Sequence, residues 1–283
     1  MRVVVCLILS LLAGSAFAAF PCSYTAERKL DIDPAGLHSL AFKLGSSDLQ
    51  VRGVTGLAKI EVRGKACASE EAKLVGLTVD QSRAGDRVTL TPNQANEQTF
   101  SLFGSNYAYI DLEVRVPATL AIEVKANSGD ANIADVAALD FDSHSGDLIV
   151  HHVNGEVAVE VHSGDIKADD IGGLEVRRSG SGDVRATQVH GQIKVGHVGS
   201  GDLGFDDVAK SVQVESVGSG DVSVNRAGGD VVIGSIGSGD INVDGVGGDF
   251  VVRKAGSSDI HHHGVKGKVD VPRRDADEDT SDE

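Results

Sequence analysis

The chain has 283 residues, of which 42 are Asp or Glu and 26 are Lys or Arg, so its net charge is −16. That charge argues against nucleic acid and anionic membrane surfaces as partners, and it suits an exported, soluble protein.

The first 18 residues have the features of a secretory signal peptide. Arg2 supplies the positive start, an apolar run follows from Val3 to Leu12, and Ala16-Phe17-Ala18 is a small-residue cleavage signature. The segment is too short to span a membrane, and no second apolar stretch could do so. We therefore expect residues 1–18 to be removed and the mature protein to be periplasmic, secreted or on the surface of a bacterium, without an integral membrane segment.

Two cysteines, Cys22 and Cys67, remain in the mature chain. Cysteines of exported proteins most often pair, so we expect a disulfide that ties the first strand to the end of the first strand unit. The alternative is a pair of buried free thiols.

Residues 19–125 are expected to form a β-rich cap over one end of the molecule. They contain one early repeat unit, GSSDLQVRGVTGLAKIEV (45–62), which matches GSSDIHHHGVKGKVDV (256–271) almost position for position. Between Cys67 and Asn106 the repeat vanishes, and longer alternating segments typical of hairpins replace it.

Aromatic residues crowd into one stretch of this cap, TFSLFGSNYAYIDL (99–112). Exposed aromatic side chains beside Asn and Ser suit the recognition of a sugar or a peptide, whereas buried ones would form the small core of a hairpin. The binding candidates are Phe100, Phe103, Tyr107 and Tyr109.

A tetrapeptide, Gly-Ser-Gly-Asp or a close variant, recurs through the rest of the chain at spacings of 17, 18, 18 and then four times 19 residues. A fixed period of this kind marks a repeat architecture in which each unit buries its apolar side on the next. The motif ends at Asp130, Asp147, Asp165, Asp183, Asp202, Asp221, Asp240 and Asp259.

Each repeat has the pattern of short strands joined by glycine corners. In the unit at Asp240 the apolar residues alternate by two within each strand, as in Ile241 and Val243 and then Phe250 and Val252. Gly pairs and Gly-Ser-Gly turns supply the positive φ angles that corners require. The sequence therefore predicts an all-β fold, a single-stranded parallel β-helix (β-solenoid) over residues 126–271. Eight rungs at roughly 4.8 Å would make a rod about 38 Å long.

The column of motif Asp residues has two interpretations. Each carboxylate could accept hydrogen bonds from backbone N–H groups or the Ser hydroxyl of its own turn, which is a structural role. Alternatively, calcium ions could lie between the rungs, as in nonapeptide β-rolls, although this chain lacks that nonapeptide. We expect the structural role, with no metal or cofactor, and keep calcium as the alternative.

Histidines also recur at matching positions of neighbouring rungs, as at His144 and His162 and at the corner formed by His151 and His152. Stacked imidazoles could share a zinc or copper ion. No Cys or carboxylate completes a tetrahedral set at a recognisable spacing, so exposed corner histidines are the expectation, including the run 261–263.

An enzyme would need a cleft, and corners of two to four residues provide no walls for one. We therefore expect no catalytic residues. The segment 272–283 is almost entirely acidic and polar, and we expect a disordered tail there.

The rungs, together with the run DLEVRVPATLAIEVKANSGDANI (111–133), resemble the bacterial putative adhesin family of β-strand repeat proteins, a domain of unknown function related to the heads of auto-transporter adhesins. The resemblance covers about residues 110–270. It implies a surface or envelope protein and supplies no catalytic residues. Together with the signal peptide and the loop-poor rod, it leads us to expect a non-enzymatic interaction or adhesion module whose partner is an envelope component, protein or glycan. The alternatives are a calcium-dependent β-roll and, less favoured, a polysaccharide-acting enzyme.

Overall fold

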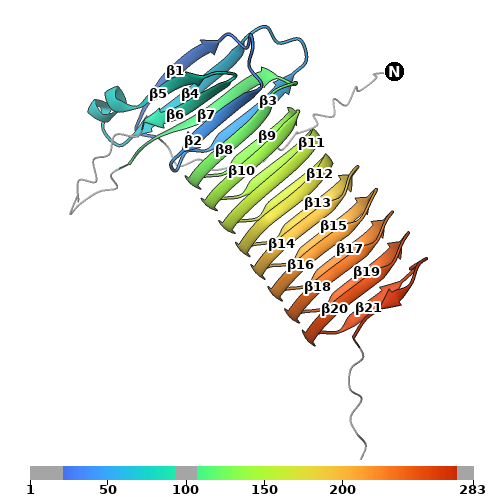
Figure 1. Ribbon diagram of the computed structural model, residues 1–283. Helices are drawn as coiled ribbons and strands as arrows, with labels where there is room; N and C mark the ends of the chain where they lie inside the picture. The colour runs from blue at the N-terminus through green and yellow to red at the C-terminus, as the bar shows by residue number, and fades with distance from the viewer. Residues whose placement is uncertain (1–21, 94–106, 273–283) are drawn as a thin grey trace, which may run out of the picture.

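The computed structural model describes residues 22–93 and 107–272, which form an elongated β-structure with a broader cap at one end (Figure 1). The expected signal peptide, Phe100, Phe103 and the acidic tail beyond residue 272 lie outside the described residues. Within the described part of the chain, no helix is long and apolar enough to cross a membrane.

The cap holds eight strands and one short 3₁₀ helix among the described residues. They are β1 (Tyr24–Ile32), β2 (Ser39–Leu44), β3 (Leu49–Val54), β4 (Ile60–Ala68), η1 (Glu71–Gly76), β5 (Thr78–Ala84), β6 (Arg87–Asn93), β7 (Ala108–Pro117) and β8 (Ala121–Ser128).

The rod continues with two strands per circuit. They are β9 (Ala131–Val136), β10 (Ala138–Ser145), β11 (Leu148–Ser163), β12 (Ile166–Ser181), β13 (Val184–Val189), β14 (Ile193–Ser200), β15 (Leu203–Val208), β16 (Val212–Ser219), β17 (Val222–Ala227), β18 (Val231–Ser238), β19 (Ile241–Val246), β20 (Phe250–Ser257), β21 (Ile260–His263) and β22 (Val269–Asp270). In β11 and β12 a single strand runs around the corner and serves both faces of the rod.

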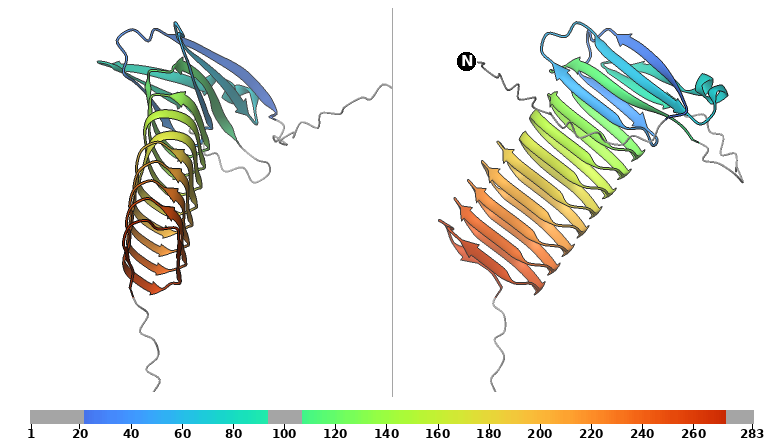
Figure 2. Two further views of the ribbon diagram at one scale, coloured as in Figure 1. Left: turned by 90° about the vertical axis from the view of Figure 1, so that its right-hand side faces the viewer. Right: turned by 180° about the vertical axis from the view of Figure 1, so that it is seen from behind.

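The predicted β-solenoid is confirmed. Every rod strand pairs in parallel with its equivalent one rung away, so the rod has two faces with one strand of each rung on each face (Figures 1 and 2). Alternate apolar residues point between the faces: in the rung of β17 and β18, Val222, Val224, Val231 and Ile233 are fully or almost fully buried. Because burying each such side chain contributes roughly 1.5–3 kcal/mol, one continuous core holds the whole stack together.

The early rung is inserted into the stack out of chain order. β3 lies between β7 and β9, and β2 lies between β6 and β8, all in parallel register. Both edges of β2 are therefore occupied, so the strand that follows β3 cannot pair beside β2 on the face of the rod that contains β2. β4 instead pairs antiparallel with β1 and β7, so of the matching segment 45–62 only the β3 half stacks as a rung.

We call the face of the rod formed by the strands that follow each Gly-Ser-Gly-Asp motif the first face. Near the end of each strand on this face, one residue adopts a left-handed backbone conformation. Six successive rungs place a residue other than glycine there, with φ between 52° and 62°, and the next two use glycine. Such a conformation costs roughly 1–2 kcal/mol per residue. Side-chain pairs between rungs offset part of the cost, as where Arg226 binds Asp206 and Asp207 of the rung before it. The six residues are Asp135, His152, Asp170, Gln188, Asp207 and Arg226.

The Gly-Ser-Gly turns stack backbone on backbone. Gly220 has φ 149°, and a Cβ atom there would lie 2.2 Å from the carbonyl oxygen of Gly201 in the rung before it. No side chain fits in that space, so the glycine of this turn sets how closely two rungs approach.

Replacing Gly220 by Ala should lower the free energy of unfolding by about 3 kcal/mol, because the added methyl group must push two backbones apart. Gly56 is the matched control: its φ is 73° and a Cβ would meet nothing within 4 Å, so Gly56→Ala should cost only about 1 kcal/mol. Denaturant unfolding of both variants measures the difference. Equal losses would contradict this account of the turns.

Candidate binding hollow on the N-terminal sheet

The motif Asp residues link neighbouring rungs. The backbone N–H of each one donates to Oδ1 of the Asp in the rung before it, at 2.8–3.1 Å throughout the eight motif positions. The sequence predicts these hydrogen bonds within a single turn. They run between turns because the turns stack directly, so the N–H of one faces the carboxylate of its neighbour.

This ladder extends beyond the motif into the cap. Asp130 N–H donates to Asp48 at 3.0 Å, and Asp48 N–H donates to Asp111 at 3.2 Å. Asp48 carries the motif signal GSSD, whereas Asp111 carries none and joins through the pairing of Leu112 with Leu49. Asp111 is thus the first carboxylate of the ladder.

The first carboxylate of the ladder, Asp111, and a carboxylate in its middle, Asp183, have pKa values shifted in opposite directions. The hydrogen bond from Asp202 N–H is the main cause that lowers the pKa of Asp183, as expected for a carboxylate that accepts a backbone donor. Burial is the main cause that raises the pKa of Asp111, and the hydrogen bond from Asp48 N–H and the charge of Lys65 only partly oppose it. Burial therefore destabilises the charged form of the Asp111 carboxyl.

Among residues 22–93 and 107–272, no group of three or more His, Cys, Asp or Glu side chains is arranged to hold a metal ion. The Oδ1 atoms of the ladder accept backbone N–H groups. The geometry is that of the structural role, and calcium stays an alternative for experiment.

The corner histidines mostly contact the neighbouring rungs. The rings of His144 and His162 stack at 4.9 Å on the surface, and His151 Nδ1 lies 3.0 Å from Asp169 Oδ2. His190 forms a similar contact with Asp170, and this hydrogen bond is the main cause that lowers the pKa of Asp170. His263 contacts Asp244 in the same way. His262, at an inward position, lies with its ring 5.9 Å from that of Phe250.

A hollow of about 760 Å³ lies on the cap, over the part of the first face where the strands change from parallel to antiparallel. Its walls come from β1, β4, β7 and β3. In Figure 2 the strands of this sheet turn away from the axis of the rod, so that they lie at an angle to the rungs below. The side chains that line it are mostly charged: Glu27, Lys29, Arg63, Lys65, Asp111, Glu113 and Asp48.

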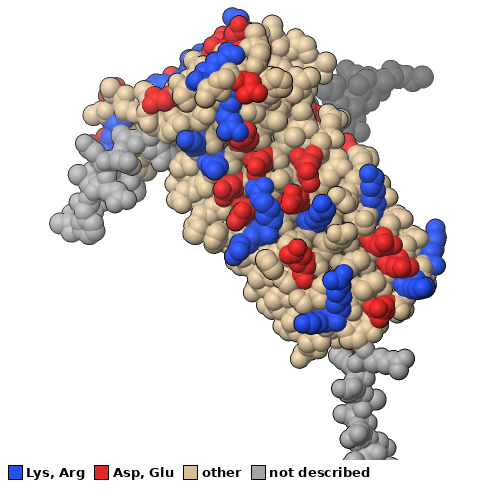
Figure 3. Space-filling view, viewed as in Figure 1, with Lys and Arg blue, Asp and Glu red and all other residues tan. Residues whose placement is uncertain are grey.

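Cross-strand pairing sets the charges of the hollow in two rows. One row runs Glu27, Lys65, Asp111 and the next runs Lys29, Arg63, Glu113, through the antiparallel register of β1, β4 and β7. Both signs are therefore present within one or two strand widths. Figure 3 shows the same mixing of acidic and basic side chains over the visible face of the cap and rod.

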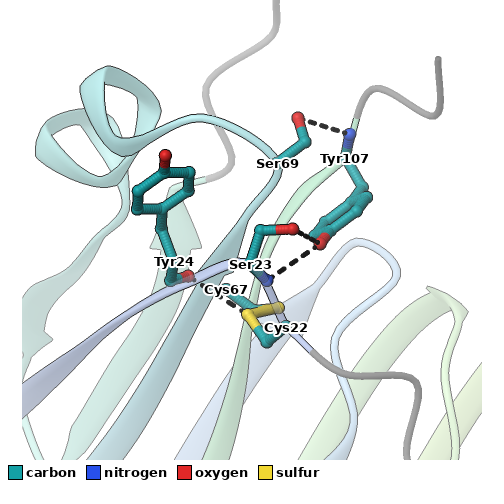
Figure 4. Close-up of a disulfide and its surroundings, with 6 residues drawn as sticks. All are labelled: Cys22, Ser23, Tyr24, Cys67, Ser69 and Tyr107. Atoms are coloured by element: carbon teal, nitrogen blue, oxygen red, sulfur yellow. Dashed lines mark hydrogen bonds between the residues drawn. A yellow bond between two sulfur atoms is a disulfide. The ribbon is translucent and has the colours of Figure 1, made fainter.

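Tyr109, one of the predicted binding residues, lies beside the hollow on the same side of β7 as Asp111. Burial and the charge of Asp111 raise its pKa. Tyr107 has another role: its hydroxyl oxygen accepts a hydrogen bond from the Ser23 backbone N–H at 3.1 Å and lies 3.0 Å from the Ser23 hydroxyl (Figure 4). Tyr107 therefore fixes the segment that leads into β1, while Tyr109 adjoins the charged rows.

A disulfide joins Cys22 to Cys67 at this same point (Figure 4). It fastens the start of β1 to the end of β4 and closes a separation of 45 residues. On the chain-entropy account a loop of that size is worth about 4 kcal/mol. The disulfide thus holds one wall of the hollow in place.

Replacing Asp111 by Asn should raise stability at neutral pH. Because burial raises the folded-state pKa of Asp111 above its unfolded value, wild-type stability falls as pH rises between those two values, and the loss is complete above the folded pKa. The Asn variant should lose its advantage below about pH 4, where the wild-type carboxyl is protonated. Denaturant unfolding across pH measures this, with Asp142→Asn on an exposed position as the control. An Asn variant that is less stable than wild type at pH 7 would contradict the desolvated state of Asp111.

Comparison with known proteins places these features in a family. Similar solved structures include a putative adhesin of Bacteroides fragilis (14% identity, TM-score 0.44, covering 89% of this chain and 99% of that one). A putative cell adhesion protein of Clostridium sporogenes (13%, 0.33, 88% and 100%) and a putative lipid binding protein of Parabacteroides distasonis (14%, 0.44, 87% and 97%) are also similar. Identities this low say nothing about function, and no curated protein matches the chain. The model of one protein family matches residues 55–245, well over half of the sequence, and the chain therefore belongs to the Toastrack DUF4097 family.

Proposed function

We propose that the mature protein is an exported, non-enzymatic interaction module of the bacterial envelope, and that it binds an envelope component, protein or glycan, through the hollow on its cap. The observation that carries the proposal is the pair Lys65 and Glu113. Both line the hollow, and neither forms a direct salt bridge among the described residues, although Lys65 faces Asp111 across the strands. Charged groups that a protein leaves unpaired in a concave site are available to a ligand.

The hollow is suited to binding because it is held in shape before any ligand arrives. Its strands are fixed by continuous cross-strand pairing, and the disulfide fastens β1 to β4. A site that is already ordered loses little conformational entropy on binding. Tyr109 beside the hollow adds an aromatic ring of the kind that recognises sugars and peptides.

Export is supported by the sequence from Met1 to Ala18 and by the disulfide. Disulfides persist in oxidising compartments such as the periplasm and the cell exterior.

The non-enzymatic character of the proposal is supported by what the polar side chains do. The ladder carboxylates and most corner histidines contact groups of neighbouring rungs, and the rod corners are short. A polysaccharide-acting enzyme is the less favoured alternative. It would require turnover that survives purification and disappears when one carboxylate is changed.

Co-sedimentation of the mature protein with envelope fractions of a Gram-negative bacterium tests the proposal. Lys65→Glu should weaken binding roughly tenfold, since it reverses a charge in the hollow, a change worth about 1.4 kcal/mol. Lys194→Glu, on an exposed position of β14 in the rod, is the matched control and should bind like wild type.

The same assay in millimolar calcium and in chelator separates the alternatives. Binding in both conditions favours a preformed module, and binding only with calcium favours the metal-dependent alternative. If Lys65→Glu binds as well as wild type, the hollow is not the site. If wild type binds nothing in either condition, the envelope role itself is wrong.

A further inference from the structure

The cap ends in an open strand edge. Among the described residues, β1 pairs only with β4, so its other edge has no strand beside it. At nine residues it is longer than the other open terminal strands of the described chain, β5, β21 and β22, which have seven, four and two residues, and longer than the part of β20 that β22 leaves unpaired. An edge of this length, about 30 Å, offers a row of unpaired N–H and C=O groups.

This edge strand is firmly held in its sheet. The disulfide fixes its start, and the Arg28 guanidinium on its inner side donates to the carbonyl oxygens of Leu77 at 2.7 Å and Leu74 at 2.5 Å. The strand therefore keeps a regular alternation over its whole length, with Glu27 and Lys29 outward and exposed. An edge that is already ordered can accept another strand at little entropic cost.

The outward charges select one way of pairing two copies. In a two-fold antiparallel pair, opposed side chains lie on the same face, so the axis must pass through a residue. An axis through Glu27 or through Lys29 sets like charges opposite each other. An axis through Leu30 sets Lys29 opposite Asp31, but it brings Glu27 opposite Asp33 and overlaps only the second half of the strand. An axis through Arg28 sets Glu27 of each copy opposite Lys29 of the other, twice, and it sets Thr25 opposite Asp31.

Charged edges often serve to prevent pairing, and they do so by repulsion between like charges. Here the outward charges have both signs. Lys29 Nζ lies 2.7 Å from Glu27 Oε2 within the strand, and Asp31 is paired with Arg63 of β4. Exchanging the Glu27–Lys29 pair within each copy for the two equivalent pairs between copies leaves none of these four charges unpaired. The two Arg28 side chains on the axis are held on the carbonyls of Leu74 and Leu77, on the other side of the sheet.

We propose that two copies of the protein associate through antiparallel pairing of β1 with β1, centred on Arg28, which joins the two cap sheets into one. The two-fold axis is perpendicular to the sheet, so both hollows open on the same side of the dimer. The contact is one strand long, and the dimer is therefore weak and concentration-dependent.

Sedimentation velocity and native mass spectrometry over a wide range of protein concentration test the association. Wild type should pass from monomer to dimer as concentration rises. Glu27→Lys should weaken the dimer roughly tenfold, because it sets Lys opposite Lys twice. The double variant Glu27→Lys with Lys29→Glu should restore it, since the charges are again complementary. Glu156→Lys, at an exposed corner of the rod, is the control and should dimerise like wild type.

Amide hydrogen exchange identifies the interface, with protection expected to rise at β1 as the protein is concentrated. A protein that stays monomeric at every concentration would overturn the proposal. So would a dimer that Glu27→Lys leaves unchanged, or one that the double variant fails to restore. Protection of β1 that appears only when an envelope extract is added, and that Lys65→Glu leaves unchanged, would show that a strand of another protein occupies the edge. Circular dichroism of each variant distinguishes lost pairing from lost folding, and the outcome is independent of whether the hollow binds an envelope component.

Discussion

The contact on which this structure depends is that of one Gly-Ser-Gly turn with the next. The turns approach so closely that no Cβ fits at Gly220, and at that distance the carboxylate of one Asp meets the backbone N–H of the next. A column of carboxylates about 4.8 Å apart would repel itself if each were free. Because Oδ1 of each ladder Asp up to Asp240 accepts a backbone N–H, the ladder offsets part of that repulsion and orders the corner.

The stack of Gly-Ser-Gly turns ends at the cap, and the candidate site lies at that end. Asp111 begins the ladder, and beyond it the sheet changes from parallel rungs to the antiparallel strands β4 and β1. Its carboxyl is more strongly desolvated than it is hydrogen-bonded, which is why its pKa moves in the opposite direction to that of Asp183. Regular rungs must be alike in order to stack, so a terminal unit is free to carry different chemistry.

Much of the fold could be predicted from the sequence because each rung repeats the same local rules. The period, the alternation and the glycine corners identify the solenoid. The order of the rungs could not be predicted: similarity identifies the unit at β3 but not its place between β7 and β9. Asp111 has no motif and joins the ladder only through register, and the hollow arises from a change of strand direction far from the repeat. The left-handed bends were also hidden, since His152 and Arg226 carry no glycine signal.

Binding in the hollow and pairing through β1 use the same two side chains. Glu27 and Lys29 line the hollow, and they are also the residues that face the second copy. A ligand that binds Lys29 removes the partner of Glu27 in the other protomer, whereas a ligand that binds only Lys65 and Glu113 leaves the pairing intact. Because such coupling is reciprocal, dimerisation must change the affinity for the first kind of ligand by the same factor by which that ligand changes dimerisation. A ligand that spans both hollows would instead gain from the dimer, since its second contact would form at high effective concentration.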